Sequence, residues 1–396
     1  MTRPTALLLV ACALSMGCDF SVTFVPVHEG ADIQQNLRPA LAENGTVVTM
    51  GFSSLKVSSG SGPSTSIDLT PSGLDPALAD ERAYRRVQVR STGEIVFIAR
   101  RPEPTCSSGL MIGTYVRLPS GAITPLVEEC RASDTRFDEV AMSPNGTVAV
   151  STAAGLGNSG RPGAIWRGPS TGPLSVLQSA GPVVFNTSWL DVNDAGRTVV
   201  QTEYFGPTLV RGNLLFDTPE QPLSALESAT ERTDVSIQTP VAINGSGVVA
   251  FTADTPFTMI IGGMPYTHSA GVYVATPTPI QTPKRLTQIA NLDGALCGFG
   301  NVDINNAGIV VFEAKLDGEP GCSDPNVYDA LYRYGSSVTA FALRSDTSAS
   351  PLGSHCDYHS VRLGQINSAQ QVSFLTISTD AGEPPVKVWR ADIVPG

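Results

Sequence analysis

Short apolar segments recur along the chain, and a polar turn that ends in glycine opens each of them. DINNAGIVVFEA (303–314), VAINGSGVVAFTA (241–253) and DVNDAGRTVVQTE (191–203) are three examples. One apolar residue stands four places before the glycine, and others stand two and four places after it, which is typical of a β-hairpin with a buried face. The residues in between are often apolar too, as in IVVF and VVAF. We therefore expect both faces of each hairpin to be covered.

This hairpin occurs in seven copies. The residue that closes the turn is glycine in six of them and glutamine in the last: Gly45, Gly93, Gly146, Gly196, Gly247, Gly308 and Gln370. The intervals are 48, 53, 50, 51, 61 and 62 residues. A period near fifty indicates a propeller or an array, because one such unit does not bury its own faces.

A second hairpin follows the first in most copies. It carries a Tyr or Trp in its first strand at 113–127, 164–178, 271–287 and 330–343. Two hairpins make a four-stranded propeller blade. The sequence therefore predicts an all-β fold, a seven-bladed β-propeller of four-stranded blades, as a single domain over residues 18–396. An open array or a six-bladed ring with an atypical end is the alternative.

The last copy is too short for a fourth strand, because only VKVWRADIVPG (386–396) follows its first hairpin. DFSVTFVPV (19–27) reads as a strand that has no partner in the first copy. We predict that this N-terminal strand completes the last blade and closes the ring, which would remove both exposed edges.

Asn stands three places before the closing residue in four copies, at Asn193, Asn244, Asn305 and Asn367. An Asn that opens a turn bonds to its own backbone, and a Gly that closes it accepts the left-handed conformation. The pattern is also similar to the D-x-N-x-x-G of calcium loops. In two copies, however, Ala195 or Ala307 occupies the position of a ligand, and no bidentate Glu follows. Turn formation is the preferred interpretation, with calcium binding as the alternative.

These units resemble a bacterial tandem-repeat family with the consensus N-x-x-G-x-x-A-F. NGSGVVAF (244–251) and NNAGIVVF (305–312) carry it most clearly, and the resemblance covers about residues 40 to 390. The copies at Gly45, Gly93 and Gly146 lack the Asn, and Gln370 replaces the Gly. SPNG (143–146) also resembles the turn of TolB-type propeller repeats. The resemblance implies a propeller in a surface or secreted protein, and it implies no particular activity.

The N-terminal stretch MTRPTALLLVACALSMGCDF has the form of a secretory signal, with one Arg before an apolar run and small residues before a Cys. Its end, LSMGC, resembles the lipobox of bacterial lipoproteins, with Cys18 as the lipidated residue, although Ser15 stands where Leu is usual. LVAC (9–12) fits that pattern better but leaves a shorter apolar core. We expect residues 1–17 to be a lipoprotein signal peptide and the protein to be a membrane-anchored lipoprotein outside the cytoplasm. A plain secreted protein is the alternative.

The acidic composition argues against a nucleic-acid partner. The formal charge is −11, and it becomes −12 without residues 1–17, which contain one Arg and no acid. Such a surface repels polyanions. No cofactor motif is present, and we expect a monomer.

The positions of the five cysteines that follow Cys18 in the sequence predict two disulfides. Cys106 and Cys130 flank the second half of one unit, and Cys322 and Cys356 occupy equivalent places in a later unit. We predict the bonds Cys106–Cys130 and Cys322–Cys356, in keeping with an oxidising compartment. Cys297 would then be unpaired, and it competes with Cys356 for Cys322.

Two further groups of residues could form a metal site or a catalytic site. His355, Cys356, Asp357 and His359 lie in SHCDYH (354–359), where a shared metal is the less favoured interpretation. The neighbouring acids Glu128–Glu129 and Asp138–Glu139 could act as a glycosidase pair, but adjacent surface acids are far more common. We identify no catalytic motif and assign no metal site.

One candidate ligand site remains. Five places before the closing residue, the copies carry Ala40, Gln88, Ala141, Asp191, Ala242, Asp303 and Gln365. If the first strand of each blade lines the axis, Gln88, Asp191, Asp303 and Gln365 would gather at the central channel, where propellers often bind ligands. A hydrated channel lining without a ligand is the alternative.

These observations favour a lipid-anchored, non-enzymatic binding or scaffold module with an unknown protein or polysaccharide partner. The alternatives are a hydrolase or lyase that acts on polysaccharides, with carboxylates at the channel mouth, and a purely structural envelope protein. Of the four polar residues, Asp303 is the one for which the sequence suggests no role in folding.

Overall fold

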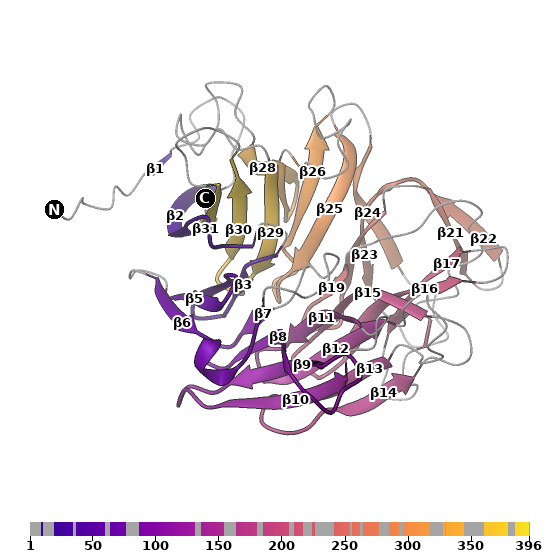
Figure 1. Ribbon diagram of the computed structural model, residues 1–396. Coiled ribbons are helices and arrows are strands. Elements are labelled where there is room, and N and C mark those ends of the chain that lie inside the picture. The colour runs from indigo at the N-terminus through magenta and orange to yellow at the C-terminus, as the bar shows by residue number, and fades with distance from the viewer. Residues whose placement is uncertain are drawn as a thin grey trace.

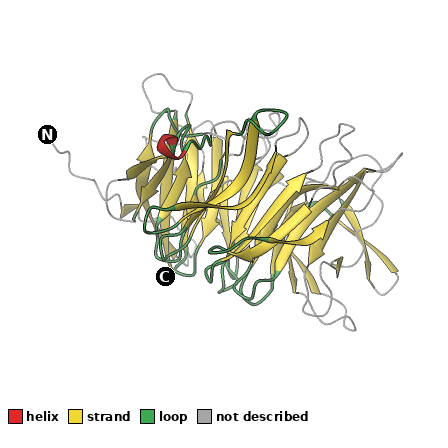
Figure 2. Ribbon diagram, turned by 60° about the horizontal axis from the view of Figure 1, so that its bottom comes forward, coloured by secondary structure: helices red, strands yellow, loops and turns green. Residues whose placement is uncertain are grey.

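The structure is a computed structural model of all 396 residues. It describes residues 9–10, 20–34, 37–59, 64–76, 87–130, 136–153, 164–179, 185–205, 210–216, 224–225, 241–253, 256–261, 264–276, 285–292, 296–316, 328, 330–343, 360–378 and 385–395. Strands dominate these parts, with one short 3-10 turn, η1 (Thr70–Ser72), in red in Figure 2. No helix in the described part of the chain is long and apolar enough to cross a membrane.

The strands form a β-propeller (Figure 1). Sheet 1 holds β3 (Ala40–Leu41), β4 (Val47–Met50), β5 (Ser54–Ser58) and β6 (Thr65–Asp68). Sheet 2 holds β7 (Val87–Val89), β8 (Ile95–Pro102), β9 (Leu110–Arg117) and β10 (Ile123–Cys130). Sheet 3 holds β11 (Arg136–Met142), β12 (Thr147–Ala153), β13 (Ala164–Pro169) and β14 (Ser175–Ser179).

Three more four-stranded sheets follow. Sheet 4 holds β15 (Phe185–Val192), β16 (Thr198–Phe205), β17 (Val210–Phe216) and β18 (Ser224–Ala225). Sheet 5 holds β19 (Val241–Ile243), β20 (Val249–Ala253), β23 (Gly271–Thr276) and β24 (Arg285–Asn291). Sheet 6 holds β25 (Leu296–Ile304), β26 (Val310–Leu316), β27 (Ala330–Tyr334) and β28 (Val338–Leu343).

The closing sheet joins the two ends of the chain, as Figure 1 shows. Its order is β1 (Leu9–Val10), β2 (Phe20–Glu29), β31 (Val386–Pro395), β30 (Gln371–Ile377) and β29 (Ser360–Ile366). The predicted pairing of the N-terminal strand with the last repeat is thus present, from Phe20 opposite Pro395 to Glu29 opposite Lys387. The structure has six four-stranded blades, so the prediction of seven such blades is wrong, although four strands per blade is confirmed. The closing sheet has five strands because β1 pairs with β2.

The first strands of successive sheets contact one another in a closed circle: β3, β7, β11, β15, β19, β25, β29 and again β3. Apolar clusters fill the space between adjacent sheets. Between sheets 5 and 6, for example, Val272 packs with Ile304, Val310 and Phe312. The repeated apolar positions around each turn therefore join neighbouring sheets, as expected for sheets with two buried faces.

The closing residue of every repeated turn has a positive φ, as the turn chemistry predicts. The six glycines have φ between 72° and 92°, and Gln370 adopts the same left-handed conformation with φ 58°. In each copy, its N–H donates to the carbonyl three residues earlier, as from Gly308 to Asn305 over 3.0 Å. Gly is the residue that takes this conformation at the least cost.

The hairpin of β21 (Phe257–Ile261) and β22 (Met264–His268) was not predicted. It is inserted between β20 and β23 of sheet 5. Phe257 and His268 stack on each other, and both contact the ring of Tyr273. This insertion explains why the interval from Gly247 to Gly308 is among the longest.

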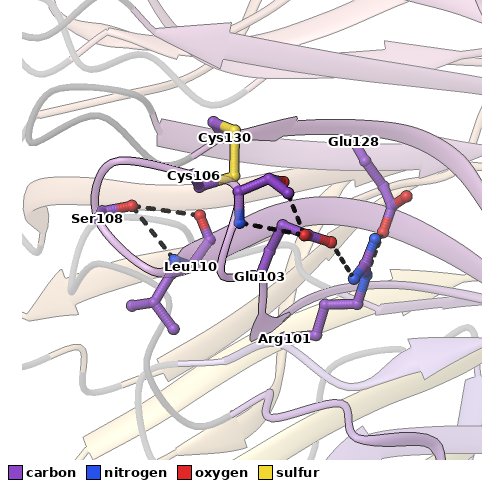
Figure 3. The surroundings of a disulfide bond; sticks show 8 residues. Arg101, Glu103, Cys106, Ser108, Leu110, Glu128 and Cys130 are labelled. Carbon is purple, nitrogen blue, oxygen red and sulfur yellow. Dashed lines mark hydrogen bonds and ion pairs between the residues drawn. A yellow bond between two sulfur atoms is a disulfide. The ribbon is translucent and has the colours of Figure 1, made fainter.

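The predicted disulfide between Cys106 and Cys130 is present, with a Cα–Cα distance of 5.3 Å (Figure 3). It joins the turn between β8 and β9 to the end of β10. Cys297 is also disulfide-bonded, so the prediction that it would be unpaired is wrong. Its partner lies outside the described residues, as do Cys322 and Cys356.

Candidate binding site at the channel mouth

The ends of the first strands and the turns that follow them surround one opening on the axis, which we call the mouth. Its lining comprises residues 41–43, 88–91, 142, 144, 191–194, 243–245, 303–306 and 365–366. The opening holds about 660 Å³, open solvent included. Turns from six four-stranded sheets and the end of β29 therefore converge on one site.

All four predicted channel residues, Gln88, Asp191, Asp303 and Gln365, line the mouth. Gln88 and Asp303 are buried, at 3% and 6% exposure. The two Gln side chains meet each other, with Gln365 Nε2 donating to Gln88 Oε1 over 3.0 Å. This contact joins the closing sheet directly to sheet 2. Sheet 1, which lies between them in the circle, has the apolar Ala40 at the equivalent position.

Three of these side chains also link one sheet to the next. Asp191 Oδ2 accepts the main-chain N–H of Ile243 at 2.9 Å. Asp303 Oδ2 accepts that of Ile366 at 2.7 Å. Gln365 Oε1 accepts that of Leu41 at 3.0 Å. The inference that folding leaves Asp303 without a role is therefore wrong, because its carboxylate satisfies a buried backbone donor of the closing sheet.

The Asn residues of the turns form a second set of links. Each Oδ1 accepts backbone N–H groups of its own turn, as from Ala307 and Ile309 to Asn305 at 3.1 and 3.0 Å. Each Nδ2 donates to a carbonyl of the next sheet: Asn193 to Asn244, Asn244 to Asn305, Asn305 to Asn367 and Asn367 to Ala42. The predicted role in the turn is confirmed, and the link to the next sheet is additional.

Other side chains complete this ring where the Asn is missing. Asn44 Nδ2 donates to Ser91 O at 3.1 Å, and Arg90 Nε donates to Pro144 O at 2.8 Å. Asn145 Nδ2 donates to Asp194 O. Hydrogen bonds thus run from each sheet to the next around the whole mouth. This ring was not foreseen, because Asn44 and Asn145 stand one place before the closing residue instead of three, and Arg90 takes the place of the Asn in the second copy.

A buried layer closes the channel below the mouth. Seven places before the closing residue stand Arg38, Glu139, Trp189, Asn301 and Leu363, all of them buried. The Arg38 guanidinium lies 4.5 Å from the centre of the Trp189 ring and donates to Asn301 Oδ1. Asn301 in turn donates to the buried Glu313 at 2.6 Å. The mouth is therefore a pocket with a floor, and the repeat numbering would have identified this layer in the sequence.

Glu128 does not belong to this site. It lies on β10, the outermost strand of sheet 2, and accepts Tyr115 Oη at 2.7 Å and Arg101 Nε at 2.9 Å. Partial burial raises its pKa, but the hydrogen bonds from Arg101 and then Tyr115 outweigh this and hold the pKa of Glu128 below its usual value. Burial, followed by the hydrogen bond to Glu128, raises the pKa of Tyr115. Figure 3 shows the ion pair of Glu128 with Arg101 beside the disulfide.

His28, Ser64 and Asp32 form the one group that resembles a nucleophile and base within the described residues. His28 Nδ1 lies 2.8 Å from Ser64 Oγ, whereas its Nε2 lies 3.8 Å from Asp32 Oδ1. Asp32 is held instead by Lys56, at 2.5 Å. Burial and the charge of Lys56 lower the pKa of His28. Because the carboxylate does not orient the imidazole, we interpret this group as a contact between β2 and sheet 1.

The remaining predicted site residues fall elsewhere. Cys18, Cys322 and Cys356 lie outside the described residues, as do His355, Asp357 and His359 of the SHCDYH segment. In the parts of the chain that the structure describes, no three His, Cys, Asp or Glu residues are grouped as metal ligands.

Comparison with known proteins identifies the fold alone. No protein-family model matches the chain, and no curated protein matches its sequence. The crystal structure of polysaccharide lyase Uly1 is similar over 93% of this chain and 92% of its own, with a TM-score of 0.55 and 7% identity. The β-propeller domain of the trilobed protease from Pyrococcus furiosus matches over 74% of this chain and 92% of its own, with a TM-score of 0.38 and 11% identity. At such identities the similarity carries no assignment of activity.

Proposed function

We propose that this protein is a non-enzymatic binding module that takes its ligand at the mouth. The observation that carries this proposal is the convergence of the polar residues Gln88, Asp191, Asp303 and Gln365, from separate sheets, on one floored pocket. A concave site with a few fixed polar groups is the usual form of a ligand site.

The chemistry of the mouth favours binding over catalysis. Its lining among the described residues includes no His, Lys, Cys or Tyr. Asp191 and Asp303 each hold a main-chain N–H of the neighbouring sheet. Carboxylates held in this way are suited to binding a ligand in one orientation. A polysaccharide hydrolase or lyase needs instead a general acid or base that is placed to exchange a proton with the substrate.

The proposal is tested by a paired screen of the wild-type chain and the D191N/D303N double variant. Asn keeps an oxygen that can accept the main-chain N–H, so we expect the fold to persist while the charge of the mouth is lost. Glycan arrays and immobilised envelope proteins should reveal a partner that is retained by the wild type and lost by the variant. Equal binding by both chains would place the ligand elsewhere. Depolymerisation of a polysaccharide by the wild type would favour the enzyme alternative.

We further propose that the protein is anchored outside the cytoplasm through a lipid on Cys18. Cleavage before this residue would remove β1, which lies at residues 9–10, from the closing sheet. The remaining order β2-β31-β30-β29 has four strands and would act as the seventh blade. The lipid would then stand two residues before β2, at the closure of the ring.

A pair of Cys variants separates the two candidate cleavage sites. We expect C18S to abolish acylation and to release the protein from membranes, because the modified thiol is lost, whereas C12S should leave both unchanged. Mass spectrometry of the mature N-terminus gives the readout. Acylation that persists in C18S and disappears in C12S would assign the lipid to Cys12. Absence of acylation from the wild-type chain would favour a plain secreted protein.

A further inference from the structure

We propose that the ligand group that enters the mouth is an organic cation, the ammonium of a lysine side chain or an equivalent amine. This inference rests on the proposed binding function and specifies the class of ligand. It is carried by the charge of the lining, by one carboxylate oxygen at the rim, and by the shape of the site.

The lining is strongly acidic. It holds Glu43, Asp191, Asp194 and Asp303 against one cationic residue, Arg90, a formal charge of −3. Arg90 is itself engaged, since its guanidinium forms an ion pair with Glu94 at 3.0 Å and donates to Pro144 O. Carboxylates that surround a recess raise the local concentration of cations.

Asp194 carries a more specific signal. Its Oδ2 accepts Asn306 Nδ2 over 3.3 Å, a bond that spans from sheet 4 to sheet 6 across the rim. Its Oδ1 is shielded from solvent and has no hydrogen-bond partner among the described residues. A buried carboxylate oxygen without a donor is costly, and an incoming ammonium group would supply the donor.

Other classes of ligand fit the mouth less well. A sugar ring is usually held against an aromatic face, and no aromatic residue occurs in the lining that the structure describes. A metal ion needs several grouped ligands, and the described residues provide no group of three. A nucleic acid or another polyanion would be repelled.

The floor of the mouth limits the ligand to a group that enters from one side. Arg38 and Trp189 stack in the buried layer, where Arg38 donates to Asn301 and Asn301 donates to Glu313. This layer lies two residues deeper along the first strands than Asp191 and Asp303, about 7 Å at the rise of a strand. A slender side chain with its charge at the tip suits such a blind recess.

The test is titration calorimetry of the full chain in mild detergent with Nα-acetyl-lysine methylamide. The matched probe without a charge is Nα,Nε-diacetyl-lysine methylamide, and putrescine represents a free amine. We expect the lysine probe to bind, the diacetyl probe not to bind, and added salt to weaken binding. Similar binding of putrescine would identify small amines as the source, and preference for the lysine probe would identify a protein partner.

The D194N variant should weaken binding by about tenfold, the factor expected for the loss of one charge-assisted hydrogen bond. Asn at this position keeps an oxygen for Asn306, and D191N provides a second variant of the mouth. D68N is the matched control, because Asp68 lies on the outer strand β6 and its bond to Thr70 N is also kept by Asn. Equal affinity in wild type, D194N and D191N, or equal binding of the two lysine probes, would overturn the inference.

A neutral oligosaccharide, maltotetraose, separates this inference from the proposed function. If it bound in a manner sensitive to D191N/D303N while the amines did not bind, the binding function would stand and the cationic ligand would be wrong. If no ligand of either class, including those in the array screen, depended on the mouth variants, both proposals would fail.

Discussion

A chain that lacks residues 20–29 is expected to be recovered unfolded or aggregated. These residues form β2, which pairs with β31 along its whole length. Without it, β31 becomes an exposed edge, and the closing sheet loses Phe20 and Phe24 from the cluster that joins it to sheet 6. Exposed apolar edges promote association between chains. Circular dichroism and size-exclusion chromatography give the readout.

A single substitution in β2 gives a measurable estimate of how much this strand stabilises the fold. Phe24 is 7% exposed and packs edge-on against Phe374, with ring centres 6.0 Å apart. We expect F24A to lower the free energy of unfolding by about 3–5 kcal/mol, the usual cost of removing a buried Phe. V394A is the control, since Val394 is 55% exposed and its loss should change stability by no more than about 0.5 kcal/mol. Similar, small effects of both substitutions in urea denaturation would show that β2 does not close the ring.

Loss of Asn305 is expected to have the second large effect. Its side chain makes three hydrogen bonds, two within its turn and one to Asn367 O at 3.0 Å. Asn305 is 4% exposed, so N305A would leave the buried acceptor Asn367 O and two partly buried backbone donors without partners. At about 1 kcal/mol for each bond, we expect the free energy of unfolding to fall by about 3 kcal/mol or more.

The control for N305A is N44A. Asn44 makes the same kind of link, from Nδ2 to Ser91 O at 3.1 Å, but Asn44 itself is exposed, whereas Asn305 is buried. Water can replace its bonds, so we expect a loss of about 1 kcal/mol or less. Denaturant unfolding at constant slope measures both values. Equal losses for N44A and N305A would mean that burial of the Asn side chain does not govern the strength of the ring.

Much of the architecture was predictable because residues with the same structural role recur at the same positions in each repeat. The apolar positions beside Gly247 and Gly308, and the Asn three places before each, recur with constant spacing, so the buried faces and the turns followed directly. The closing strand was predictable because the last repeat lacks a fourth strand while the segment at 19–27 lacks a partner. The inserted hairpin β21–β22 was not, because it occurs once and has no sister copy for comparison.

The site was predictable only in outline. One repeat position located Asp191 and Asp303 at the channel mouth, where both line one pocket. The bonds of these carboxylates to Ile243 and Ile366 were hidden, because each joins residues 52 or 63 positions apart in the sequence. The role of Asp194 was hidden for a related reason: its neighbour across the rim, Asn306, belongs to the turn two sheets further on.

The central claim is that the ligand binds in the mouth, and methyl NMR of isoleucine-labelled protein tests it most directly. Ile243, Ile304 and Ile366 lie at the ends of the cores between sheets and also line the mouth, whereas Ile98, Ile112 and Ile165 lie in such cores and do not line the mouth. On addition of Nα-acetyl-lysine methylamide, or of any partner found in the screen, we predict shifts confined to the first three methyl groups. Shifts at the core isoleucines with none at the mouth would contradict the account.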